Sequence, residues 1–119
     1  MSKVVAWAVF LLGAGHILFG VMQFQAPLLA AVTDGFIGQF AAPEIRRTAF
    51  WFVMVGPLVM LVGHLAIHAV RAGDFKVLKV IGIYMLIFSA VGVAAFPVSP
   101  LWAPLLLSLL LLAIAYRLI

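Results

Sequence analysis

Three histidines are the residues of this sequence best suited to exchange a proton near neutral pH, and all of them lie within long apolar stretches. His16 stands between glycines in FLLGAGHILFG, while His64 and His68 are four residues apart and share one helix face. An imidazole in hydrocarbon is costly and is expected to face protein or a wet cavity. We therefore expect His16 to point toward neighbouring helices. It is our first candidate for an acid–base group, with His64 and Tyr84 as further candidate catalytic residues.

Depth along a helix separates these candidates. At ~1.5 Å per residue from the flanking basic residues, His16 lies ~20 Å, His64 ~10 Å and Tyr84 ~12 Å from the same membrane boundary. This spacing predicts that His16 is level with Pro57, and it allows a hydrogen bond between His64 and Tyr84. The alternative for His16 is a neutral ring that bonds a neighbouring helix and does nothing more.

The sequence offers few residues that could hold a metal ion or a haem. The chain has no cysteine, which excludes thiolate metal sites and disulfides. His16 and His64 differ in height by ~10 Å, too far for one zinc ion or for a haem held between them. The spans contain no carboxylate to orient a histidine in a hydrolytic triad. We therefore expect neither a metal nor another cofactor.

A second set of polar or aromatic residues is a candidate for ligand binding. Glu44 and Arg47 are three residues apart, can pair on one helix face, and precede Trp51 at the expected outer boundary. They could form a polar lip over a pocket, or they could mark the boundary and touch lipid phosphates. Gln23 and Ser89, on the polar sides of two spans, complete the set.

The elements that must position these residues are membrane helices. The chain of 119 residues is 68% hydrophobic and only 8% charged, so lipid must solvate most side chains. A span needs ~20 apolar residues. We predict an all-α, polytopic four-helix membrane bundle that forms one domain, with spans at residues 4–24, 48–70, 77–96 and 101–116. The first stretch is longer than the apolar region of a signal peptide, and we interpret it as a helix of the mature protein.

Small residues and capping signals refine this plan. Along the first span one stripe is mostly small or polar and predicts close helix packing; it holds Ala6, Val9, Gly13, His16, Gly20 and Gln23. The first loop is apolar and predicts a short interfacial helix over 27–32 and a turn at Asp34–Gly35. We expect Pro43 and Pro100 at first helical positions, Ser99 as an N-cap and Gly73 as a C-cap.

Charge predicts the orientation. Five basic residues fall at one end of the spans, Lys3, Arg71, Lys76, Lys79 and Arg117, against Arg46 and Arg47 at the other. The positive-inside rule then places both termini in the cytoplasm. Basic residues scattered at helix ends form no patch for nucleic acid, so membrane lipids are the expected partners.

Three segments carry a resemblance to a known group of proteins. GAGHILFG, AFWFVMVGPLVMLVGHL and FPVSPLW resemble small bacterial four-helix membrane proteins of uncharacterised function that are broadly DoxX-like. The resemblance implies fold and membrane location but no activity. The size is also similar to that of small multidrug transporters, but His16 stands in the helix where those proteins carry a glutamate.

Three functions stay open at this point. The first is a ligand-binding or accessory membrane protein whose polar seam around His16 holds a small apolar or lipid-like molecule. The second is an enzyme that acts on a lipid, a quinone or a terpenoid-like substrate with His16 as acid and base. The third is a small dimeric transporter. A homodimer or a larger membrane assembly is compatible with all three.

Overall fold

The computed structural model describes residues 2–119 and is all-helical, as predicted. Five helices follow one another, with no strand among the described residues: α1 (Ser2–Gln23), α2 (Gln25–Thr33), α3 (Glu44–Ala72), α4 (Phe75–Ala95) and α5 (Trp102–Ala115). The predicted short helix in the first loop is present as α2, and it begins two residues earlier than expected.

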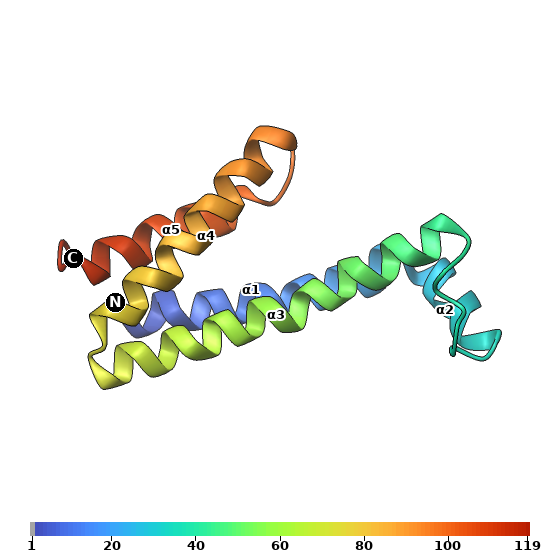
Figure 1. Cartoon of the computed structure of the whole chain (residues 1–119), viewed down its shortest axis with the longest axis horizontal. Helices are drawn as coiled ribbons and strands as arrows, with labels where there is room; N and C mark the ends of the chain where they lie inside the picture. Colours follow the sequence, from blue (N-terminus) through green and yellow to red (C-terminus); the bar gives the residue numbers. More distant parts are fainter. Residues whose placement is uncertain (1) are drawn as a thin grey trace.

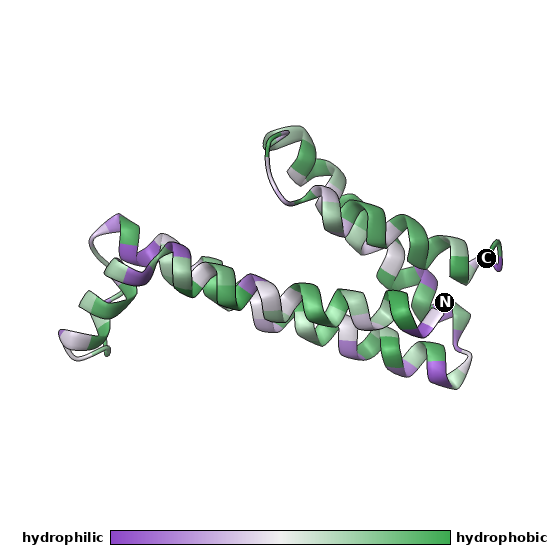
Figure 2. Cartoon of the chain, turned by 180° about the vertical axis from the view of Figure 1, so that it is seen from behind, coloured by the Kyte–Doolittle hydropathy of each residue, from purple (hydrophilic) through white to green (hydrophobic). Residues whose placement is uncertain are grey.

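Three of these helices are long and apolar enough to cross a membrane: α1, α3 and α4. Hydrophilic residues gather mainly at the two ends of the α1–α3 pair, and apolar residues dominate between them (Figure 2). The fourth predicted span is shorter than expected, because α5 has 14 residues and a length of ~21 Å. The hydrocarbon layer of a bilayer is ~30 Å thick.

The helices form two antiparallel pairs that meet at one end only. α1 packs along α3, and α4 packs along α5. The pairs touch near the two termini and the α3–α4 turn, and the α4–α5 hairpin then diverges from the α1–α3 pair (Figure 1). The two helix pairs are therefore joined at one end and apart at the other, and α2 is a fifth helix beside α3, so the arrangement differs from the predicted four-helix bundle.

The core lies where the two pairs meet. Val9 of α1, Ala66 of α3, Leu78 of α4 and Leu111 of α5 are buried together in one apolar cluster. At this end Lys79 lies over the ring of Tyr116, 4.4 Å from its centroid, a cation–π contact between the paired helices α4 and α5.

Small residues form the seam between α1 and α3: the sequence predicts the stripe on α1, and the matching stripe on α3 is a finding of the structure. They recur every seven residues and are all buried: Ala6, Gly13 and Gly20 on α1, and Ala49, Gly56 and Gly63 on α3. A Cβ atom on Gly13 would lie 2.5 Å from the backbone nitrogen of Met60 and 2.7 Å from the oxygen of Gly56. Such a close backbone approach leaves no room for a side chain at Gly13.

The predicted helix ends are close but not all correct. Gly73 is the C-cap of α3 with φ 68°, as expected. Pro43 is the N-cap of α3 rather than its first residue. The last helix begins at Trp102 after an N-cap at Leu101, so Ser99 caps a preceding turn instead: its hydroxyl donates to the oxygen of Phe96 and accepts from the Leu101 nitrogen.

Candidate functional site

His16 faces the neighbouring helix, as the cost of an unsatisfied imidazole predicts. Its Nε2 atom lies 2.7 Å from the backbone oxygen of Phe52 in α3. The two rings are stacked, with centroids 4.2 Å apart and planes 19° apart. His16 therefore ties α1 to α3 through both a polar and an aromatic contact.

The bonded carbonyl lies one residue before the carbonyl that Pro57 leaves without a helical donor. Pro57 has no N–H for the oxygen of Val53, which the sequence suggested as the loosened carbonyl. The structure instead brings His16 to the preceding carbonyl, that of Phe52. A carbonyl oxygen has two lone pairs, so it can accept the histidine in addition to its helical partner. The predicted level of His16 beside the Gly56–Pro57 step is confirmed.

Phe52 is the centre of an aromatic cluster that the sequence analysis did not single out. Its ring centroid lies 6.0 Å from that of Phe19 and 5.2 Å from that of Phe24, in addition to the His16 contact. Gly20 makes room for it, since a Cβ there would lie 2.7 Å from the Phe52 ring. The position of Phe52 five residues before Pro57, opposite the glycine stripe of α1, was the signal that could have found it.

A shallow, open groove of about 470 Å³ runs along the N-terminal half of α3. The lining residues, all from α3, are Glu44, Arg47, Thr48, Trp51, Phe52 and Val55. Charged side chains therefore lie at the end of the groove nearest the start of α3, and aromatic and apolar ones lie toward His16. Three of the predicted ligand-binding residues meet here.

The groove continues the face that packs against the other hairpin deeper in the protein. Val62 packs against the core. Val55 and Thr48 precede it by seven and fourteen residues, so all three lie on one side of α3. On α1, His16 follows the buried Val9 by the same step. Since α4 and α5 have diverged at this level, neither covers the groove (Figure 1).

The remaining candidate residues lie elsewhere. His64 and His68 are exposed, and so is Tyr84, with 72% of its surface accessible. No hydrogen bond joins His64 to Tyr84 among residues 2–119, so that expected pair is not formed. Equal depth did not bring them together because each points away from the helix contacts.

Ser89 and Gln23 do not take part in the groove. Ser89 is fully buried against α5, and its hydroxyl donates to the backbone oxygen of Met85 one turn earlier in α4. Gln23 is exposed at the end of α1. Ser89 is thus a packing residue whose hydroxyl is satisfied within its own helix.

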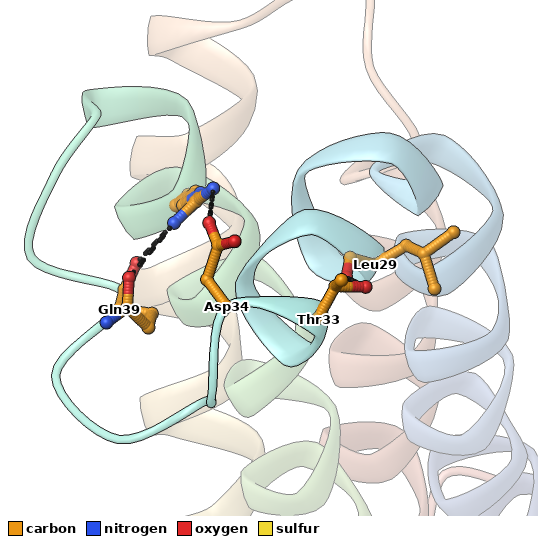
Figure 3. Close-up of polar contacts among 5 residues, drawn as sticks. Leu29, Thr33, Asp34 and Gln39 are labelled. Atoms are coloured by element: carbon orange, nitrogen blue, oxygen red, sulfur yellow. Dashed lines mark hydrogen bonds and ion pairs between the residues drawn. The ribbon is translucent and has the colours of Figure 1, made fainter.

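The ion pair at the start of α3 differs from the Glu44–Arg47 pair that sequence spacing allowed. Within residues 2–119, Arg46 rather than Arg47 forms an ion pair, and its partner is Asp34 rather than Glu44, at 2.7 Å. Arg46 also donates to the backbone and side-chain oxygens of Gln39, both at 3.4 Å (Figure 3). These bonds fasten the irregular segment 34–43 to α3 and leave Glu44 and Arg47 at the groove.

The second cavity has a different character. It has about 190 Å³ and lies under α2 and the following loop, lined by Val21, Leu28, Val32, Phe36, Phe40, Phe50, Val53 and Met54. All its lining side chains are apolar, which explains why the first loop is so hydrophobic. In the part of the chain from Ser2 onward, no group of three or more acidic or histidine residues is placed to hold a metal ion.

Comparison with known proteins gives a family but no activity. No curated protein and no solved structure matches the chain significantly. A family model described as a family of unknown function, DUF6463, matches residues 1–118. Since this match covers nearly the whole sequence, the chain belongs to the DUF6463 family.

Proposed function

We propose that this protein is a membrane protein that binds a lipid-like, largely apolar molecule in the groove of α3. The observation that carries the proposal is the order of side chains along the groove. Glu44 and Arg47 lie at its outer end, Trp51 lies in the middle, and Phe52 and Val55 lie toward His16. A molecule with a polar head and an apolar body matches this order.

The expected position of the groove across the bilayer supports the same ligand class. α3 has 29 residues and is ~43 Å long, close to the ~40–45 Å of a whole bilayer with its headgroups. Its first turn, with Glu44 and Arg47, then lies at headgroup level. Val55 is eleven residues after Glu44, ~16 Å deeper, and lies within the hydrocarbon.

The proposal includes the finer architecture and location. We place the chain in a bacterial inner membrane with both termini in the cytoplasm, because the five basic residues at the closed end outnumber the two at the other. The likeness to DoxX-like proteins belongs to the same proposal and rests on the three loose motifs. In the membrane, lipid or a second copy would complete the bundle at its open end.

Single cysteines test the orientation, because the chain has none of its own. Thr33→Cys lies at the end of α2, and Ala72→Cys lies at the end of α3. A membrane-impermeant maleimide added to intact spheroplasts should label Thr33→Cys and leave Ala72→Cys unlabelled. The reverse pattern would contradict the proposed topology.

Filling the groove tests the binding function. Val55→Trp places a large ring in the groove, whereas Leu18→Trp places the same ring at an equal depth on the opposite, exposed side of the α1–α3 pair, where Leu18 is 64% accessible. Each variant is purified in nanodiscs made directly from membranes, and its retained apolar molecules are identified by mass spectrometry after extraction.

We expect one class of lipid-like molecule to be enriched over bulk membrane lipid with the wild type and with Leu18→Trp. With Val55→Trp this enrichment should be lost. The same lipid profile in all three samples would refute the proposed function.

A further inference from the structure

We infer that the groove recognises a lipid chain that carries a hydroxyl group at mid-length, through the Nδ1 atom of His16. This inference rests on the proposed function and names the ligand class within it. It follows from the tautomer of His16, from the accessibility of Nδ1 and from the position of the ring along the groove.

The contact with Phe52 determines which nitrogen of His16 carries a proton. A backbone oxygen can only accept, so Nε2 must be the N–H donor in the 2.7 Å bond. In the neutral ring, Nδ1 then holds a lone pair and acts as an acceptor. A ligand group that bonds to Nδ1 must therefore be a donor, and among lipid-chain substituents a hydroxyl is the simplest donor.

The Nδ1 atom lies at the protein surface. Within residues 2–119, every buried side-chain nitrogen or oxygen atom has a hydrogen-bond partner. His16 is half-buried, and its hydrogen bond to protein is made by Nε2. Nδ1 must therefore be accessible. At this depth the surroundings are acyl chains, which offer no donor, and an unsatisfied polar atom there is unfavourable.

His16 lies beside the inner end of the groove. His16 is not itself a lining residue, but its ring stacks on Phe52, which is, and it lies seven residues after Val9, which is buried in the core that includes α5. The Cα atom of Arg47 lies five residues before that of Phe52 on α3, ~7.5 Å closer to the membrane boundary, and the Arg47 side chain leans further toward that boundary because helical side chains point toward the helix N-terminus. A lipid whose head lies beside Arg47 would bring the middle of its chain, rather than its first carbon atoms, to Nδ1.

Matched fatty acids test the inference. Ricinoleate and oleate share the carboxylate, the chain length and the double bond, and they differ in a mid-chain hydroxyl. A third probe, α-hydroxyoleate, carries its hydroxyl next to the carboxylate. Binding is measured in nanodiscs by displacement of dibromostearate, which quenches Trp51 in a Trp7→Phe/Trp102→Phe background.

We expect ricinoleate to bind about three- to tenfold more tightly than oleate, the range of one net hydrogen bond. α-Hydroxyoleate should bind like oleate. His16→Phe retains the stacked ring but has no acceptor, so the ratio of ricinoleate to oleate affinity should fall to about one. His64→Phe, at an exposed histidine outside the groove, should retain the preference.

A second measurement does not depend on a variant. In protein labelled with ¹⁵N-histidine, ricinoleate should shift one Nδ1 resonance, and oleate should not. A ricinoleate preference that survives in His16→Phe, an equal gain for α-hydroxyoleate, or an unshifted Nδ1 resonance would overturn the inference.

Two outcomes separate this inference from the proposed function. Equal binding of ricinoleate and oleate that is blocked by Val55→Trp would reject the hydroxyl contact and leave the groove as a lipid site. Displacement that Val55→Trp does not change would reject both.

Discussion

The Nε2 atom of His16 and the backbone oxygen of Phe52 lie 2.7 Å apart, and the rings of the same two residues are stacked. One residue pair thus joins α1 to α3 twice. The contact lies near Gly13 and Gly56, where the two backbones approach closely. A histidine within a membrane helix is therefore explained first by packing, and its second nitrogen is what remains for a ligand.

Replacement of His16 should reveal these two contributions separately. His16→Ala removes the hydrogen bond, worth ~0.6 kcal/mol between membrane helices, and the stacked pair, worth about 0.5–1.5 kcal/mol. His16→Phe removes only the bond. We expect the free energy of unfolding in mixed micelles to fall by about 1–2 kcal/mol for alanine and by about half as much for phenylalanine. Equal losses would contradict a contribution from stacking.

Two glycines of the first span should respond in opposite ways to alanine. A Cβ on Gly13 meets backbone atoms of α3, whereas a Cβ on Gly15 meets no atom within 4 Å. Gly13→Ala should separate α1 from α3 and cost about 1–3 kcal/mol. Gly15→Ala should be neutral or stabilising by up to about 1 kcal/mol, because alanine is the better helix former. Thermal unfolding of both variants would show the difference, and similar melting temperatures would exclude the observed seam.

Loss of the Arg46 contacts should loosen one segment and leave the rest unchanged. Asp34 is 53% exposed, so its ion pair is screened by water and contributes less than about 1 kcal/mol to global stability. Arg46→Gln should nevertheless increase hydrogen–deuterium exchange across residues 34–43. The matched variant Arg47→Gln, at the groove, should not. Unchanged exchange in Arg46→Gln would show that apolar contacts alone hold this segment.

His64 and Tyr84 should behave as independent residues. Both are exposed and neither bonds to the other. The effects of His64→Ala and Tyr84→Phe on the free energy of unfolding should add within about 0.5 kcal/mol in the double variant. A larger coupling in a double-mutant cycle would mean that the pair meets in the membrane after all.

Features set by local chemistry were predictable from the sequence. Hydropathy located the long helices. Gly73 marked the end of α3, and the Asp34–Gly35 turn marked the end of the short helix α2, because caps and turns depend on a few neighbouring residues. The small-residue stripe predicted the seam with α3, since close approach needs glycine at regular steps. The inward direction of His16 followed from the cost of an unpaired imidazole.

Features that depend on distant parts of the chain were not predictable in the same way. Depth placed His64 level with Tyr84, but rotation about each helix axis decides whether two side chains meet. The Arg46–Asp34 pair depends on the path of an irregular loop, which spacing along one helix cannot reveal. The two hairpins diverge because they pack together at one end only. The hydrophobic periodicity of a single helix does not predict how far two hairpins stay in contact.

The short last helix has a consequence for the surrounding bilayer. In the membrane location that we propose, α5, which is ~21 Å long, is ~9 Å shorter than the hydrocarbon layer. The bilayer next to α5 must become thinner, or the α4–α5 hairpin must move further into the hydrocarbon layer. Either response costs fractions of a kcal/mol per Å of mismatch. Both are relieved where the membrane is already thin. Hydrophobic mismatch alone should thus concentrate this protein in thinner membrane regions and draw copies together.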